Sequence, residues 1–148
     1  MRVVIQRSSY AEVFIDKVSV GKIDKGYTIL VAFTHGDTID DIKYMVNKIL
    51  KLRIFDDENG VMNLDIKKVG GKILSISQFT LYANTKEGNR PSYTMAMKRE
   101  EAIKLYDEFN NELRKNDIEV QTGIFGSDMD VRIHNDGPIT IIIDSKGW

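Results

Sequence analysis

The alternation of apolar and polar residues predicts β-strands in the first third of the chain. Residues 2–7, 11–15 and 18–23 have the length and residue preferences of short strands with tight connections. Residues 27–34 (YTILVAFT) form an apolar run of strand length that is rich in β-formers, which indicates a buried strand. Residues 72–82 (KILSISQFTLY) extend this pattern and predict a central strand of the sheet.

Two further segments have the spacing of amphipathic helices. The first ends near Arg53, and either Asp37 or Thr38 can cap its start, with Asp41 completing a box-like pattern after Thr38. Its apolar face consists of Ile42, Met45, Val46, Ile49 and Leu50. The second helix is expected from about residue 97 to 115. Its buried stripe consists of Ala102, Leu105, Tyr106, Phe109 and Leu113.

Connections and later strands complete the pattern. Residues 57–60 (DENG) predict a hairpin turn, and residues 84–92 form a polar loop. Further strands are predicted at 118–122, 129–134 and 139–144. The strand at 139–144 is apolar almost throughout. We therefore expect both of its faces to be buried, one by the core of its own chain and the other by another subunit.

These elements predict one domain spanning residues 1–148. The fold class is α+β, because groups of strands are separated by two helices. The expected architecture is a curved, barrel-like pair of mainly antiparallel sheets with both helices packed on one side, in β/β/α layers.

Composition narrows the class of protein. The net charge of -1 argues against coating nucleic acid by charge alone, so any RNA contact must use a local patch and few phosphates. The absence of cysteine excludes disulfides, thiolate metal sites and cysteine nucleophiles. No apolar run reaches the roughly 20 residues of a membrane span, and the start lacks a signal peptide, so we expect a cytoplasmic protein.

Common catalytic motifs do not occur. His35 follows a predicted strand and His134 ends one, and turn or structural roles are the favoured interpretation for both. Neither lies in a metal-ligand pattern, and Walker, dinucleotide-glycine and GxSxG motifs are absent. Three hypotheses remain: a binding module, a hydrolase with Ser77 or Thr80 as hydroxyl nucleophile, or an enzyme whose substrate brings the catalytic group.

Two segments still suggest a site. In the first, Ser77 to Ala83, the alternation is typical of a plain strand, but Gln78 beside hydroxyls at a strand end needs partners or a ligand. In the second, Asn135 to Pro138, the spacing favours a hairpin turn between two strands. Alternatively, Gly137 and Pro138 present rigid backbone to a ligand.

Together the two segments resemble the D-aminoacyl-tRNA deacylases, long called D-tyrosyl-tRNA deacylases. That family carries a SQxxL and an NxGPxT motif, which stand here as residues 77–81 and 135–140. The similarity extends to the opening MRVVIQR, to HGD at 35–37, to LRIFDDENGVMNLD and to TGIFGSDMDV at 122–131.

The resemblance implies a homodimer with two active sites at the subunit interface. It implies that Gly137 and Pro138, joined by a cis peptide bond, enter the partner's pocket and read the chirality of the amino acid. It also implies that Arg7 orients this element. Phe125 and Met129 match positions near the terminal adenosine and the pocket wall.

The resemblance further implies hydrolysis of the ester that joins a D-amino acid to the 3′ end of tRNA. The neighbouring 2′-hydroxyl of the substrate assists, and the protein supplies donors for the oxyanion. The backbone N–H groups of Phe79 and Thr80 are the candidates, beside Ser77 and Gln78. No metal and no organic cofactor are expected.

The expected partners are the aminoacylated 3′ end of tRNA and a second copy of the chain, with no membrane and no DNA. Four basic residues in and after the 84–92 loop are the candidates for phosphate contacts. These residues are Lys86, Arg90, Lys98 and Arg99. The rival hypothesis from another class is a non-catalytic module that binds tRNA 3′ ends or D-amino acids.

Overall fold

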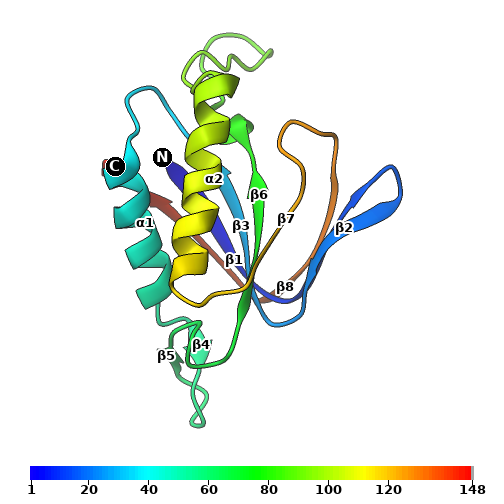
Figure 1. Ribbon diagram of the computed structural model, residues 1–148, viewed down its shortest axis with the longest axis vertical. Helices are drawn as coiled ribbons and strands as arrows, with labels where there is room; N and C mark the ends of the chain where they lie inside the picture. Colours follow the sequence, from blue (N-terminus) through cyan, green and yellow to red (C-terminus); the bar gives the residue numbers. More distant parts are fainter. Residues whose placement is uncertain (148) are drawn as a thin grey trace.

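The computed structural model describes residues 1–147 as one mixed sheet, one small hairpin sheet and two α-helices (Figure 1). The strands of the large sheet are β1 (Arg2–Ile15), β2 (Val18–Ile23), β3 (Gly26–Ala32), β6 (Lys72–Ser77), β7 (Val120–Thr122) and β8 (Asp130–Asp144). The other elements are β4 (Phe55–Asp56), β5 (Met62–Leu64), α1 (Ile39–Lys51), α2 (Arg99–Lys115) and the 3-10 helix η1 (Phe79–Tyr82).

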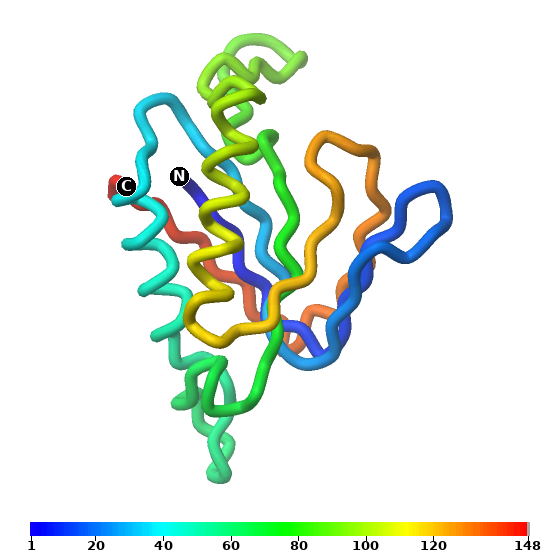
Figure 2. Tube along the Cα trace, in the orientation of Figure 1, coloured from blue at the N-terminus to red at the C-terminus, as the bar shows by residue number. Residues whose placement is uncertain are grey.

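The large sheet curves into a nearly closed barrel, as expected for the predicted α+β class. Its strand order is β2-β1-β3-β6-β7, and β8 pairs with β1. The β1 pairs with β2, β3 and β8 are antiparallel, whereas β6 runs parallel to both β3 and β7. Both helices lie on one side of the sheet, and the tube in Figure 2 shows β1 and β8 running side by side. The predicted fold class is confirmed.

Two hydrophobic cores lie on the two faces of the curved sheet. The larger core joins the sheet to the helices and contains the predicted apolar faces of both. The smaller core, on the inner side of the barrel, contains Ala11, Val13, Ile23, Leu74 and Ile76. Among residues 1–147 no helix is long and apolar enough to cross a membrane.

The predicted hairpin turn at residues 135–138 is wrong. These residues lie inside β8, and residues 2–15 likewise form one strand where two were expected. The pairing is irregular here: Gln6 pairs with Thr140 and Ser8 with Asn135. Only Arg7 lies between the two pairs on β1, whereas residues 136–139 lie between them on β8. The extra length forms a bulge, which carries the turn-like Gly and Pro without ending the strand.

The predicted central strand at residues 72–82 is too long. The β6 strand ends at Ser77, and the N–H of Gln78 donates to the carbonyl of Val31 at 2.7 Å. Hydrogen bonds from Leu81 to Gln78 and from Ala83 to Thr80 then close the turns of η1. The segment SQFTLY, which alternates like a strand, therefore forms a tight helical turn at the end of an interior strand.

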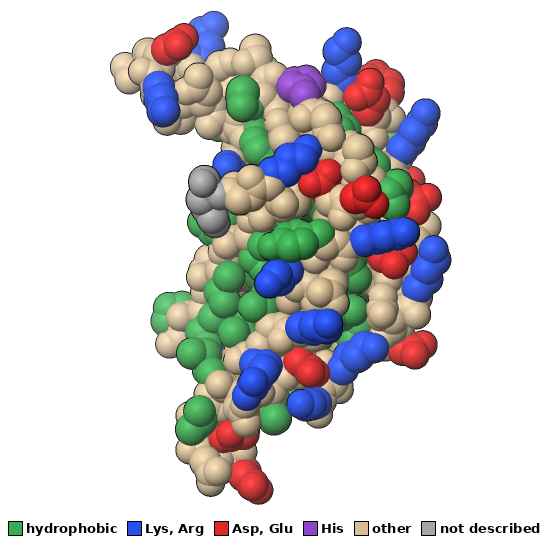
Figure 3. Space-filling view, turned by 90° about the vertical axis from the view of Figure 1, so that its left-hand side faces the viewer, with side chains coloured by type: hydrophobic (Ala, Val, Ile, Leu, Met, Phe, Trp, Pro, Cys, Tyr) green, Lys and Arg blue, Asp and Glu red, His purple; other side chains and the backbone are tan. Residues whose placement is uncertain are grey.

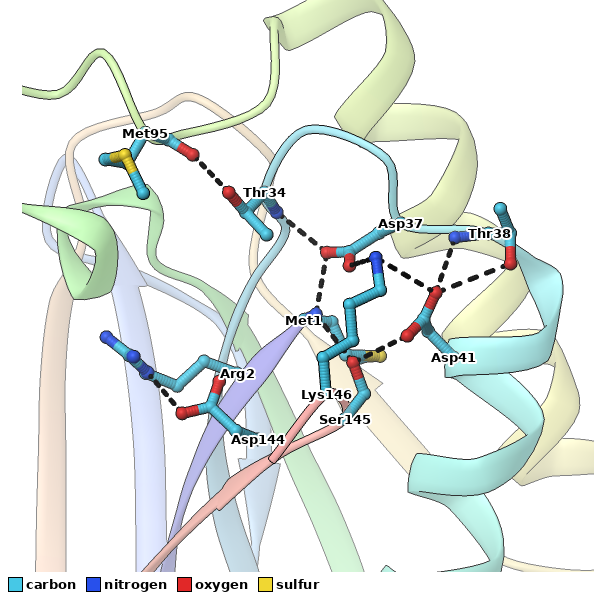
Figure 4. A network of polar contacts seen from close by, with 10 residues as sticks. All are labelled: Met1, Arg2, Thr34, Asp37, Thr38, Asp41, Met95, Asp144, Ser145 and Lys146. Atoms are coloured by element: carbon cyan, nitrogen blue, oxygen red, sulfur yellow. Dashed lines mark hydrogen bonds and ion pairs between the residues drawn. The ribbon is translucent and has the colours of Figure 1, made fainter. Parts of the chain in front are cut away.

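The start of α1 is tied to both ends of the described chain (Figure 4). Of the two predicted caps, Asp37 and Thr38, the N-cap is Thr38. The N–H of Thr38 donates to the Asp41 carboxylate at 2.8 Å. Asp41 also accepts from the Ser145 hydroxyl at 2.7 Å. Asp37 pairs with the amino group of Met1 at 2.7 Å and with Lys146 at 3.1 Å. The network joins β1, β8 and α1 at one corner.

Asp41 should make folding stability depend on pH. Burial acts to raise the pKa of this carboxyl, but the Thr38 N–H, the Ser145 hydroxyl and the nearby positive charges outweigh it and lower the pKa below its usual value. A carboxyl whose pKa is lowered in the folded state stabilises the folded protein at pH values above its unfolded pKa of about 3.9. This stabilisation is lost as the pH falls through the folded-state pKa. We expect Asp41→Asn to cost about 1 kcal/mol at pH 7 and much less at pH 2.

Urea unfolding of Asp41→Asn at both pH values measures this difference. Asp40→Asn is the matched control, because Asp40 lies in the same first turn but is exposed. An equal loss at pH 2 and pH 7, or an equal loss in the control, would contradict the assignment.

Candidate active site

A cavity of about 320 Å³ opens where β6 passes into η1. Five of the site residues predicted from the sequence line it: Ser77, Gln78, Phe79, Phe125 and Met129. Its walls are largely apolar and come from the ends of β3 and β6, from α2 and from the segment that joins β7 to β8. The other lining residues are Val31, Ala32, Phe33, Ile76, Met97, Ala102, Gly126, Ser127, Asp128 and Val131.

The first two residues of η1 are Phe79 and Thr80. The first N–H groups of a helical turn have no acceptor within that turn, so the N–H groups of Phe79 and Thr80 are not used inside η1. Phe79 lines the cavity, and Thr80 follows it directly in η1. The hydroxyl of Thr80 accepts a hydrogen bond from the Gln78 side-chain amide at 2.5 Å. Because an amide N–H is a donor and not a base, this contact does not activate Thr80 as a nucleophile.

The opposite wall depends on Gly123 and Met129. A Cβ atom at Gly123 would lie 2.3 Å from the Met129 sulfur, so a larger residue here would displace the Met129 side chain from its present position. Phe125 packs against the ring of Tyr106 with centroids 5.7 Å apart, which fixes the base of this wall. The roles of Gly123, Met97 and Ala102 were not predicted. Gly123 lies within the TGIFG segment, and a glycine in that segment is the sequence feature that points to a close contact at this position.

Arg7 lies in the opening between β1 and β8 and is almost buried, with 8% of its side chain exposed. Its guanidinium donates to the carbonyls of Ile54 at 2.8 Å and Asp136 at 3.3 Å. It also pairs with the carboxylates of Asp136 and Asp56 at 3.2 and 3.4 Å. A buried guanidinium needs such partners, so Arg7 fixes the backbone that leads into Gly137.

The next peptide bond, between Gly137 and Pro138, is cis. Gly137 has a φ of +119°, and a Cβ there would lie 2.9 Å from the Ile139 side chain. Both the backbone angle and the space therefore require glycine.

The Gly137–Pro138 element does not line the cavity of its own chain. In Figure 1, β6 rises to η1 near the upper end of the sheet, whereas the middle of β8 lies at the lower end. The structure thus separates the two sequence motifs within one chain.

None of the four basic candidates lines the cavity. All four are exposed, and Lys86 and Arg90 belong to the 84–92 loop, which a bridge between Asn84 and Ser92 closes. Lys98 is the N-cap of α2. Arg99 lies over the Phe125 ring at 5.9 Å, so it is the candidate that adjoins a cavity residue.

Comparison with known proteins agrees with these motifs. The family model described as D-Tyr-tRNA(Tyr) deacylase matches residues 4–144. A D-aminoacyl-tRNA deacylase of Lactobacillus gasseri is 54% identical, with 97% of this chain and 99% of the relative covered. One of Bacillus cytotoxicus is 53% identical, with 99% and 100% covered.

Two solved structures are also similar. The c-Myc DNA unwinding element binding protein superposes with a TM-score of 0.91 at 36% identity, covering 97% of this chain and 98% of its own. A probable eukaryotic D-amino acid tRNA deacylase has the same fold, with a TM-score of 0.80 at 18% identity over 96% and 97%. From the family match and the relatives of about half-identical sequence, we conclude that this chain belongs to the D-Tyr-tRNA(Tyr) deacylase family.

Proposed function

We propose that this protein hydrolyses D-aminoacyl-tRNA, releasing the D-amino acid and free tRNA. Water adds to the ester carbonyl, the bond to the terminal ribose oxygen breaks, and that oxygen takes up a proton. The observation that carries the proposal is the largely apolar cavity beside the first turn of η1, where the backbone N–H groups of Phe79 and Thr80 have no acceptor within the turn. Such donors stabilise the oxyanion that forms during ester hydrolysis.

The proton transfers are assigned to the substrate. Neither histidine lines the cavity, and the hydroxyl of Thr80 faces an amide donor. The ribose 2′-hydroxyl lies next to the ester in every aminoacyl-tRNA, so it can assist the attack without a protein base. The protein then contributes shape, orientation and the oxyanion donors.

The working unit is proposed to be a homodimer of single-domain chains. Gly137 and Pro138 do not line the cavity of their own chain, and in the proposed dimer they enter the cavity of the second copy. Val4 faces Leu30 on β3 and Ile142 on β8, which places three apolar side chains on one side of the sheet, and Ile142 is 48% exposed. In Figure 3 apolar side chains gather along the left of the view, while charged ones cover the right. An apolar face of this kind suits a subunit contact.

Chiral selection is assigned to the Gly137–Pro138 backbone. Arg7 fixes the approach to it through Asp136, so the element cannot easily move aside for a side chain. If the fixed backbone excludes the L side chain sterically, the enzyme discriminates D- from L-substrates without contacting the D side chain. A thousandfold preference requires about 4 kcal/mol, which a steric clash can supply.

This mode of selection predicts the order of three substrates. Glycine has no side chain to exclude, so glycyl-tRNA should be hydrolysed together with D-alanyl-tRNA, while L-alanyl-tRNA is spared. Deacylation of the three substrates at equal enzyme concentration measures the order. If glycyl-tRNA resists hydrolysis as strongly as L-alanyl-tRNA, the selection depends on binding of the D side chain in the pocket. If none of the three is hydrolysed but the tRNA end binds, the protein is a binding module.

Substrate assistance predicts which hydroxyl matters more. Thr80→Ala should retain measurable turnover, because its hydroxyl lacks an activating base. D-aminoacyl-tRNA that ends in 2′-deoxyadenosine should be nearly inert with the unchanged enzyme. Single-turnover rates with both substrates test this ranking, and the reverse ranking, or a trapped acyl-enzyme, would assign Thr80 as the nucleophile.

A further inference from the structure

Two exposed aromatic rings meet at the mouth of the cavity. Phe79 is 56% exposed and lines the cavity, and Tyr93 is 40% exposed. Their centroids lie 5.0 Å apart with an interplanar angle of 71°, so the rings meet edge to face. Large apolar rings left exposed beside a polar loop are typical of binding surfaces.

The segment that carries Tyr93 is held in place on the end of β3. The N–H of Ala96 donates to the Tyr93 carbonyl at 3.0 Å, which closes a turn. The hydroxyl of Thr34 donates to the Met95 carbonyl at 2.5 Å, a contact drawn in Figure 4. The His35 ring contacts the Thr94 carbonyl at 2.7 Å. This gives His35 a structural role and makes Tyr93 part of a preorganised surface.

The charge around the two rings suits a phosphate backbone. Lys86 and Arg90 lie in the loop that leads into Tyr93, and Lys98 follows shortly after it. Among residues 1–147 the recorded ion pairs engage none of these three cations. Exposed rings next to cations are the combination that binds single-stranded nucleic acid, because bases stack on the rings and phosphates pair with the cations.

We propose that Phe79 and Tyr93 form a stacking platform for the base of the nucleotide that precedes the terminal adenosine of tRNA. The inference rests on the proposed function, which places the aminoacylated adenosine in the cavity. A cavity of about 320 Å³ is at the small end for ligand sites, so the next nucleotide lies outside it. Because Phe79 lines the cavity and its ring contacts Tyr93, the pair adjoins the cavity, and we place the base of the preceding nucleotide on it.

The test compares two substrates that differ only in the nucleotides before the terminal adenosine. One is D-alanyl-adenosine, and the other is a D-alanylated trinucleotide ending in adenosine. Stacking on an aromatic ring changes affinity about tenfold per base. Tyr93→Leu should therefore raise KM for the trinucleotide about tenfold with little change in kcat, and should leave KM for D-alanyl-adenosine unchanged. Tyr93→Phe should behave as the unchanged protein.

Tyr44→Leu is the matched control, since Tyr44 is 44% exposed on α1, far from the cavity lining. An unchanged KM for the trinucleotide, or an equal rise with both substrates, would overturn the platform. Dissociation of the dimer by Tyr93→Leu in sedimentation would overturn it too, because Tyr93 would then be an interface residue. A trinucleotide without an attached amino acid should bind more weakly to Tyr93→Leu than to Tyr44→Leu. This result would support the platform independently of turnover. Absence of turnover in the unchanged protein would refute only the proposed function.

Discussion

Arg7 lies where the pairing of β1 with β8 opens, and its guanidinium joins the two sides of that opening. It is buried and binds the carbonyls of Ile54 and Asp136, so its removal would leave several polar groups without partners. The same contacts fix the bulge of residues 136–139 on β8. The long β1–β8 ladder and the position of Gly137 and Pro138 therefore depend on one buried charge. The cost of moving this charge holds the exposed backbone of residues 136–138 in place.

The parallel pairing of β3 with β6 places the other motif, residues 77–81, at the opposite end of the sheet from Gly137 and Pro138. It carries Ser77 and Gln78 to the end of the strand, where the chain turns into η1, and the N–H groups of Phe79 and Thr80 have no acceptor within that turn. Each chain thus has the cavity with the proposed oxyanion donors at one end and the Gly137–Pro138 element at the other. A complete site of the proposed kind needs the cavity of one chain and the element of another. The proposed dimer is then a requirement of the chemistry as well as of the apolar sheet face.

Much of the fold follows from periodic patterns in the sequence. The helical faces of α1 and α2, the cap at Thr38 and the turn at residues 57–60 lie where local spacing predicts them. The errors fall where long-range pairing overrides local preference: Asn135 to Pro138 has the composition of a turn but lies within β8, opposite Arg7. No local pattern shows that Arg7 is buried, or that Gly123 leaves space for Met129. Ser77 and Gln78 stand out in the sequence as polar residues at a strand end, and Phe125 and Met129 follow from the family resemblance. The placement of Tyr93 beside Phe79 appears only in three dimensions.

Subunit complementation tests most directly whether two chains form one site. Ser127→Trp would fill the cavity from a loop, and Gly137→Val would block the element, because a Cβ there meets Ile139 at 2.9 Å. Each variant alone should be inactive on D-alanyl-tRNA. After unfolding and refolding together in equal amounts, half of the dimers are mixed and each contains one intact site. We therefore predict recovery of about a quarter of the unchanged protein's activity. No recovery, although mixed dimers are isolated, would show that each chain forms its site alone.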